Sequence, residues 1–234
     1  LLDNFCWGDP RRLETMGSLV EAARGCHDAA VYYRTPFISG KDSLNNEYLG
    51  SDGQRHAIPP TLLISAIGII EDVRQAVTMD LKEAGNVIYL VGDHKPVSLH
   101  HGQVPDLPAQ ALEAYQALHH AMQDNLVRAC HDLSEGGLAI AAAEMCIGGR
   151  LGLTLGIQAN DPERILFDET NGCLLVEVRP EACLPFEAVM TDLPIKRIGS
   201  VSAEQRLNIS IPEQTNLLSL SVSELVAAWE TYLS

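Results

Sequence analysis

The stretch SGKDSLNNE gathers the side chains that commonly bind phosphate groups and metal ions. Gly40 lets a ligand approach the backbone closely, and the hydroxyl of Ser43 can donate to a phosphate oxygen. Lys41 supplies a positive charge for phosphate, while Asp42 supplies a carboxylate for a hard cation such as Mg²⁺. Residues 45–47 add amide and carboxylate oxygens. The composition is also that of a surface turn between two strands, so both interpretations stay open.

A second candidate is the motif HDLSEGGL, which is expected to lie where a strand gives way to a helix. Ser134 has the side chain of a helix N-cap, and Gly136 and Gly137 leave the first-turn amides uncovered by side chains. Open amides at a helix N-terminus bind anions, and the nearby Asp132 could hold Mg²⁺. The alternative is a capping motif whose glycines serve close packing. The spacing matches neither a P-loop nor a dinucleotide fingerprint.

The third candidate is the opening segment, LLDNFCWGDP. Asp3 follows two leucines and is a reasonable ligand for a ribose or a metal ion. The alternative is a turn in which an Asp or Asn side chain caps the next helix. Phe5 and Trp7 are expected to pack in a core rather than to stack on a base.

Several elements must position these motifs. Periodic apolar residues predict one amphipathic helix over 10–34, with Asp9 as its N-cap and Pro36 just after its end. A short strand at 37–38 is expected to lead into the first motif. The apolar run 61–70 predicts a strand that is buried on both faces.

The second half of the chain mixes helices and strands. The sequence predicts helices at 108–129, 135–147, 180–190 and 222–232, and strands at 86–92, 151–157, 173–179, 195–201 and 207–211. This pattern indicates an α/β protein, or an α+β protein with a mixed β-sheet flanked by helices.

A shift in composition at 71–86 predicts a domain boundary, and we expect two domains, 1–78 and 79–234. A length of 234 residues is sufficient for two small domains. The first residues include neither an initiator Met nor the basic region of a signal peptide, so we expect a chain that continues upstream.

The charge balance limits the choice of partners. The chain carries 31 acidic and 16 basic side chains, a net charge of −15, which argues against nucleic acid as the main partner. A small phosphorylated ligand remains compatible, because backbone amides and Mg²⁺ can neutralise phosphate locally. No apolar run reaches the length of about 18 residues that a membrane span requires, so we expect no membrane association. Six cysteines without a C-x-x-C pair suit a reducing cytoplasm.

Three motifs in this order resemble the PurL-type phosphoribosylformylglycinamidine synthases: LLDNFCWGDP, then TPFISGKDSLNNEY with IPPTLLISAIGIIEDV, then HDLSEGGLAIAAAEMCIGG. The resemblance covers nearly the whole chain and thins after about residue 180. It implies an AIR-synthetase (PurM)-like fold. Residues 1–78 would be the end of the second, truncated A domain, and residues 79–234 the second, C-terminal B domain.

The resemblance also implies an activity. The family converts formylglycinamide ribonucleotide (FGAR), with ATP, Mg²⁺ and glutamine-derived ammonia, to the amidine (FGAM) in de novo purine biosynthesis. The implied partners are the remainder of the synthetase chain, a PurQ-like glutaminase and, in the small form of the enzyme, a PurS-like subunit. The family's catalytic histidine and its glycine-rich ATP loop have no counterpart here. We therefore assign no catalytic residue and expect the isolated chain to be inactive.

The family's first two motifs imply roles for individual residues. Asp3 and Gly40 would contact the ATP, and Ser43 would reach the FGAR substrate. Lys41 stands where the small form often has an Asn that ligates Mg²⁺. Because a protonated lysine cannot ligate a metal ion, Lys41 is expected to contact phosphate, and Asp42 is an open replacement as the metal ligand.

The third motif is linked in the large form of the enzyme to an auxiliary ADP–Mg²⁺ site. Asp132 would be its metal ligand, and Ser134, Gly136 and Gly137 would contact the nucleotide.

Two alternatives to this function remain open. One is a non-catalytic structural module that holds ADP to brace the fold. The other is a different member of the superfamily, such as AIR synthetase, selenophosphate synthase or thiamin-phosphate kinase. Whether the parent is the small or the large form also stays open.

Overall fold

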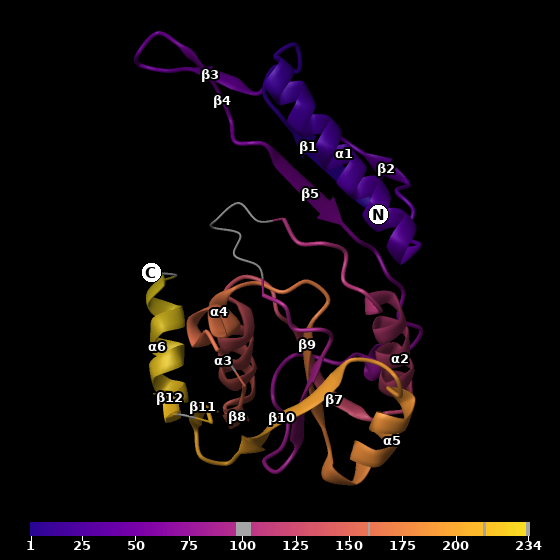
Figure 1. Ribbon diagram of the computed structural model, residues 1–234, viewed down its shortest axis with the longest axis vertical. Helices are drawn as coiled ribbons and strands as arrows, with labels where there is room; N and C mark the ends of the chain where they lie inside the picture. The colour runs from indigo at the N-terminus through magenta and orange to yellow at the C-terminus, as the bar shows by residue number, and fades with distance from the viewer. Residues whose placement is uncertain (97–103, 159, 213, 233–234) are drawn as a thin grey trace. The chain divides into compact units, whose positions relative to one another are not determined.

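The computed structural model describes residues 1–96, 104–158, 160–212 and 214–232 (Figure 1). The chain divides into two compact units, Leu1–Glu71 and Asp72–Ser234. The division falls at the start of the stretch 71–86, where the shift in composition predicts a boundary. That the two units correspond to the A and B domains of the family stays a prediction.

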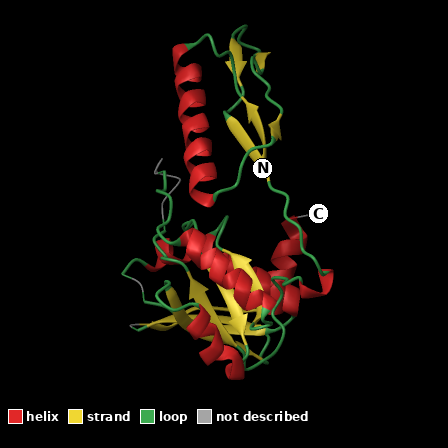
Figure 2. Ribbon diagram, turned by 90° about the vertical axis from the view of Figure 1, so that its right-hand side faces the viewer, coloured by secondary structure: helices red, strands yellow, loops and turns green. Residues whose placement is uncertain are grey.

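The first unit combines one long helix with short strands, seen side by side in Figure 2. Helix α1 (Leu13–Tyr33) accompanies a three-stranded sheet in the order β2 (Ser39–Gly40), β1 (Leu2–Cys6) and β5 (Thr61–Ser65). Strand β1 pairs in parallel with β2 and antiparallel with β5. Strands β3 (Glu47–Leu49) and β4 (Arg55–Ala57) form a separate hairpin.

One aromatic side chain ties α1 to the end of β1. Trp7 is only 4% exposed, and its indole N–H donates to the hydroxyl of Ser18 on α1 at 3.0 Å. Its ring lies 5.5 Å from that of Phe5 between centroids. The expectation that Trp7 packs in the core is confirmed. The helix ends at Arg34, which adopts a left-handed conformation at φ 55° and donates its backbone N–H to the last turn.

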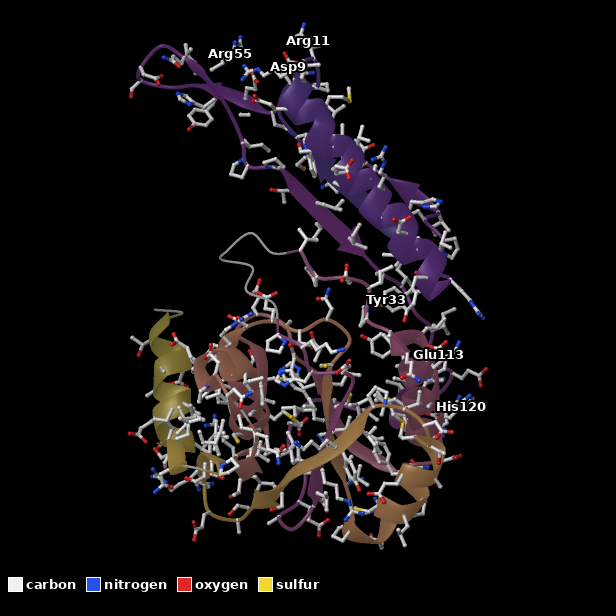
Figure 3. The ribbon with its side chains drawn as sticks, in the orientation of Figure 1. Asp9, Arg11, Tyr33, Arg55, Glu113 and His120 are labelled. Atoms are coloured by element: carbon white, nitrogen blue, oxygen red, sulfur yellow. The ribbon has the colours of Figure 1, made fainter. Side chains whose placement is uncertain are left out.

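The start of α1 differs from the prediction. The helix begins at Leu13, and its N-cap is Arg12 rather than Asp9. The Asp9 carboxylate instead accepts hydrogen bonds from the backbone and the guanidinium of Arg11, at 2.8 to 3.1 Å (Figure 3). These bonds lower the pKa of Asp9 to about 2. Because Arg11 occupies this carboxylate, Asp9 does not serve the amides of the helix.

The prediction for 61–70 is wrong in length and in burial. The strand covers only Thr61–Ser65, and the side chains of Leu63 and Ile64 are 60% and 39% exposed. Burial on both faces requires a layer on each side of the sheet. The described part of the first unit provides α1 as its only other layer. An apolar run therefore indicates a strand but does not establish what covers it.

The second unit is built on a seven-stranded mixed sheet in the order β12-β11-β8-β10-β6-β9-β7. Among the described strands of this sheet, β11 pairs in parallel with β8, and the other pairings are antiparallel. The strands are β6 (Val87–Val91), β7 (Val127–Asp132), β8 (Gly152–Gly156), β9 (Leu174–Val178), β10 (Ile195–Ser202), β11 (Arg206–Ile211) and β12 (Gln214–Ser221). The prediction of a mixed sheet flanked by helices is confirmed.

Helices cover both faces of this sheet (Figure 1). They are α2 (Ala111–Gln123), α3 (Gly137–Gly149), α4 (Pro162–Phe167), α5 (Cys183–Val189) and α6 (Val222–Tyr232), with 3₁₀ turns at Val73–Gln75 and Pro180–Ala182. Ile88 and Leu90 of β6 pack in the core that contains α3, while Tyr89 and Val91 pack in the core that contains α2 and α5. The predicted strand at 86–92 is confirmed, and it is largely buried. Within the described residues, no helix has the length and apolarity to cross a membrane.

The helix predicted at 108–129 is shorter in the structure. It covers 111–123, because Asn125 adopts a left-handed conformation at φ 56° and turns the chain into β7. Two elements, α4 and β12, have no counterpart in the prediction. Helix α4 has only six residues, too few to show an apolar helical period. In β12, Leu218 and Leu220 alternate with Ser219 and Ser221, a strand signal that the prediction overlooks.

A buried carboxylate fixes the segment before β6 to the neighbouring strand β9. Glu177 of β9 is fully buried. It accepts hydrogen bonds from the backbone N–H groups of Lys82 and Glu83, at 2.9 and 3.1 Å, and from the side-chain amide of Asn86 at 2.6 Å. These three donors compensate for the cost of burying the carboxylate.

Replacing Glu177 by Ala is expected to lower the free energy of unfolding of the second unit by about 2 to 4 kcal/mol, because two backbone amides and an Asn side chain lose their acceptor. Urea unfolding followed by circular dichroism measures the change. The control is Glu181→Ala, since the Glu181 side chain is 73% exposed in its ion pair with Arg179. Equal stability of the two variants would contradict this account.

Candidate functional site

In the first unit, the backbone holds the SGKDS turn against β1. Asp3 stands opposite Gly40 in the parallel pairing of β1 with β2. The N–H of Lys41 donates to the carbonyl of Asp3 at 3.0 Å, and the N–H of Ser43 donates to that of Phe5 at 2.8 Å. Two motifs that are far apart in the sequence therefore lie side by side.

Gly40 is needed for this close approach. A Cβ atom at this position would lie 2.5 Å from Cγ of Asp3, far inside van der Waals contact. Any other residue would have to displace the Asp3 carboxylate. The glycine therefore lets Asp3 lie directly over the turn, whatever ligand the turn binds.

The side chains of Lys41 and Asp42 make different contacts. The ammonium group of Lys41 contacts the hydroxyl of Ser43, and the Lys41 side chain is exposed. The carboxylate of Asp42 instead accepts the backbone N–H of Phe5 at 3.3 Å. A cation beside a hydroxyl suits a phosphate oxygen. Asp42 has one oxygen already engaged, which makes it the weaker candidate for a metal ligand.

Asn46 has a role that the sequence does not reveal. Its side-chain amide donates to the carbonyl of Ser43 at 2.7 Å, and its backbone N–H donates to the carbonyl of Trp7 at 3.0 Å. The first bond closes the turn on itself, and the second holds it against the residue that follows β1. The nitrogen of the amide therefore supports the turn, while its oxygen takes no part in these bonds.

In the second unit, the HDLSEGGL motif joins β7 to α3. The predicted N-cap, Ser134, is wrong, because the cap position belongs to Gly136, at φ 78°. Gly137 is also left-handed at φ 63°, and its N–H donates to the carbonyl of Ser134 at 3.0 Å. The two glycines move the helix start beyond the reach of the serine hydroxyl. In the described structure no side chain caps α3, as the sequence predicts, so its first-turn amides after Gly137 are uncovered by side chains.

Gly137 also serves packing. A Cβ atom here would lie 2.6 Å from the carbonyl oxygen of Asp168 and 3.0 Å from that of Leu166. Nearby, the N–H of Leu133 donates to the carbonyl of Cys173 at 3.1 Å. The start of α3 thus packs against the end of α4 and the residues that follow it. The packing interpretation and the ligand-binding interpretation therefore both fit the glycine pair.

Sequence reasoning misses the partners of His131. Its Nε2 lies 2.7 Å from Oε2 of Glu144 on α3, and its Nδ1 lies 3.3 Å from Oδ1 of Asp132. Adjacency makes the contact with Asp132 foreseeable. The contact with Glu144 depends on how α3 packs on β7, which periodicity does not show.

The fit for Mg²⁺ is limited to one protein carboxylate. Among the described residues, no three His, Cys, Asp or Glu side chains form a group that could hold a metal ion. Mg²⁺ is commonly bound by one or two carboxylates together with phosphate oxygens and water. Asp132 lies close in sequence to the uncovered amides of α3, so it fits an ion that arrives with a phosphorylated ligand.

A small cavity lies at the same edge of the sheet. Val91 and Asp132, the last residues of β6 and β7, both stand opposite Leu174 of β9. Beyond β6, a cavity of about 310 Å³ is lined by His94 and Lys196, among others. The Nε2 atom of His94 is buried and has no hydrogen-bond partner among the described residues. Burial lowers the pKa of His94, and the nearby Asp93 only partly opposes this shift.

The stability of the second unit is expected to decrease as the pH falls below about 6.5, where an unfolded histidine takes up a proton. Burial keeps His94 neutral to lower pH in the folded state. The unfolded state then binds more protons, so stability falls with pH. We expect His94→Gln to flatten the pH dependence of urea unfolding between pH 7 and 5, and His119→Gln, an exposed control, to leave it unchanged. If the free energy of unfolding changed equally with pH in wild type and in His94→Gln, the assignment of this pH dependence to His94 would be refuted.

Comparison with a family model shows where this chain matches known proteins. The model described as AIR synthase related protein, C-terminal domain, matches residues 81–212, which is more than half of the chain and lies within the second unit.

Two curated relatives match nearly the whole chain. PurL, a subunit of phosphoribosylformylglycinamidine synthase, from Lactobacillus helveticus is 34% identical over 98% of this chain and 31% of the relative. The same subunit from Synechocystis is 32% identical over 99% of this chain and 33% of the relative. The chain thus spans about a third of the length of these relatives. They confirm the resemblance that the three motifs indicate.

Solved structures show the same fold. The PurLQS complex from Thermotoga maritima matches with a TM-score of 0.71 at 15% identity, covering 96% of this chain and 37% of that chain. T. maritima PurL complexed with FGAR matches with a TM-score of 0.70 at 16% identity, covering 96% and 39%. T. maritima PurL complexed with ATP matches with a TM-score of 0.68 at 16% identity, covering 96% and 37%. At these identities the likeness establishes the arrangement of the elements.

Proposed function

This chain belongs to the AIR synthase related family, and on that premise we propose that it is part of an ATP- and Mg²⁺-dependent phosphoribosylformylglycinamidine synthase. The observation that carries the proposal is the match to PurL subunits over nearly the whole chain. The parent enzyme would be a ligase that forms FGAM from FGAR, ATP and glutamine-derived ammonia in purine biosynthesis. ATP would activate the formamide oxygen of FGAR by phosphorylating it. Ammonia would then displace this oxygen, which leaves as phosphate.

The ligands of the structural neighbours support this reaction. T. maritima PurL has been solved with ATP, with ADP and with FGAR. A nucleotide and FGAR are therefore the ligands we propose for the parent of this chain. The PurLQS complex supports PurQ-like and PurS-like partners alongside the remainder of the synthetase chain. We propose the cytoplasm as its location, since the family's reaction uses soluble metabolites.

In the first unit, we assign nucleotide contacts to Asp3, Gly40 and Lys41, and a contact with FGAR to Ser43. The contact between the Lys41 ammonium and the Ser43 hydroxyl supports a shared phosphate-binding role at the turn. Asp42 remains a candidate metal ligand through the oxygen that does not accept the Phe5 N–H.

In the second unit, we assign an ADP–Mg²⁺ site to the start of α3. The first-turn amides of α3, which no side chain caps, would receive the phosphates, with Ser134, Gly136 and Gly137 beside them. Asp132 would hold Mg²⁺, and the bound ion would neutralise phosphate charge. In a chain of net charge −15, such local neutralisation favours a polyphosphate ligand.

A second candidate function is a structural module in which ADP only braces the fold. It is favoured by the packing of the buried Gly137 against the end of α4, so that a ligand bound beside it would brace this contact. A ligand held there would stabilise the folded state by mass action.

Titration of the chain with MgADP is expected to show binding by calorimetry. At 100 times the dissociation constant, ADP should add about 2.7 kcal/mol to the free energy of unfolding. Asp132→Asn is expected to weaken MgADP binding about tenfold or more, because the ion loses its protein carboxylate. Asp124→Asn, an exposed residue after α2, should bind as wild type does. No heat and no stabilisation with wild type would contradict the proposed site.

The isolated chain is expected to show no turnover with FGAR, ATP, Mg²⁺ and ammonia, because the family's catalytic histidine and ATP loop have no counterpart in it. Formation of ADP that depends on FGAR and ammonia is the quantity to measure. Turnover above a no-enzyme control would overturn the expected inactivity while strengthening the assignment to the synthase family.

A further inference from the structure

The turn before β9 contains the only Asn-Gly pair in the sequence, Asn171-Gly172. Asn171 is exposed, and its side-chain amide has no hydrogen-bond partner among the described residues. Gly172 is left-handed at φ 76° and has no side chain to shield its backbone nitrogen. The electrophilic side-chain carbonyl of Asn171 is therefore followed by an unhindered backbone nitrogen.

The backbone N–H of Gly172 is also free to react. Most backbone N–H groups of a folded chain donate to an acceptor, which withholds the nitrogen from other chemistry. In the described part of the chain, the Gly172 N–H has no such acceptor. Asn125 gives the contrast, because the N–H of the next residue, Leu126, donates to the carbonyl of Ala121 at 2.9 Å. The attacking group is thus available after Asn171 and occupied after Asn125.

We propose that Asn171 is a site of spontaneous deamidation in the folded chain, a covalent modification that consumes only water. The nitrogen of Gly172 loses its proton and bonds to Cγ of Asn171. The bond from Cγ to Nδ2 breaks, and Nδ2 leaves with that proton as ammonia. Water then opens the five-membered imide. Opening at Cγ gives aspartate, and opening at the backbone carbonyl gives isoaspartate.

The one Asp-Gly pair of the sequence, Asp52-Gly53, is protected from the related isomerisation. The carboxylate of Asp52 accepts the N–H of Gln54 at 2.9 Å and lies 2.9 Å from Nε2 of His56. These contacts hold the carboxylate in place and lower the pKa of Asp52. An ionised carboxylate is a poor electrophile, so we assign the reactive position to Asn171 alone of these two.

Isoaspartate would disturb the packing of the turn, because it adds the Cβ carbon of residue 171 to the backbone. Gly172 is closely packed. A Cβ atom on it would lie 2.7 Å from Cγ of Pro108, and a Cβ atom on Gly92 would lie 2.3 Å from the Gly172 carbonyl oxygen. Strand β9 begins two residues later, at Leu174. A longer backbone at this point is therefore expected to destabilise the second unit.

The test is incubation of the folded chain at mildly alkaline pH, followed by trypsin digestion and mass spectrometry. Trypsin does not cleave before Pro180, so it releases residues 165–196, in which Asn171 is the only Asn or Gln. We expect this peptide to gain the mass difference between OH and NH₂, faster at higher pH, and to become a substrate for protein isoaspartate methyltransferase. Asn125 should stay unconverted. No conversion of Asn171 while circular dichroism shows the chain folded, or conversion only in urea, would overturn the proposal.

Two variants test the structural consequence. Asn171→Ser cannot deamidate, and Asn171→Asp carries the charge of the product on a normal backbone. After incubation, the melting temperature is expected to fall for wild type but not for Asn171→Ser, and fresh Asn171→Asp should melt as fresh wild type does. An equal fall in wild type and Asn171→Ser would show that deamidation is not the cause. A low melting temperature in fresh Asn171→Asp would assign the effect to charge and contradict the role of the longer backbone.

Discussion

The second unit depends on the register of β9, the strand between β6 and β7. Because Leu174 stands opposite both Val91 and Asp132, the ends of β6 and β7 meet at one edge of the sheet. Glu177 lies within the same strand and receives three hydrogen bonds from the segment 82–86. A slip of one residue would turn this carboxylate to the other face and away from its donors. The buried charge therefore makes the wrong register costly, and the correct register brings the candidate site together.

The first unit uses a backbone constraint of a different kind. The parallel pairing of β1 with β2 places Asp3 over Gly40, where no Cβ atom fits. The ladder continues through the N–H groups of Lys41 and Ser43, which donate to β1. The exposed side chain of Lys41 is thus not needed to hold the turn, because the backbone carries these hydrogen bonds, supplemented by the side chains of Asp42 and Asn46. A polar turn held in this way can offer side chains to a ligand while its backbone keeps its conformation.

Local sequence patterns predict most elements of the second unit, since many of its strands and helices carry apolar periods, but they miss α4 and β12. The helix at 222–232 and the strand at 86–92 lie where the sequence places them, and the strand contributes side chains to two cores. Other failures concern contacts between elements. The exposure of β5 depends on what covers the sheet, and the helix start at Gly137 depends on left-handed glycines packed against the end of α4. The pairing of His131 with Glu144 likewise exists only once α3 lies on β7.

The central claim is that the start of α3 receives a nucleotide diphosphate beside Asp132. A crystal structure of the chain grown with MgADP tests this claim most directly. The account predicts phosphate oxygens within hydrogen-bonding distance of the uncapped first-turn amides of α3, beside Gly136 and Gly137, and Mg²⁺ at about 2.1 Å from Oδ2 of Asp132. Nucleotide bound elsewhere with this helix start unoccupied, or no bound nucleotide at saturating concentration, would contradict it.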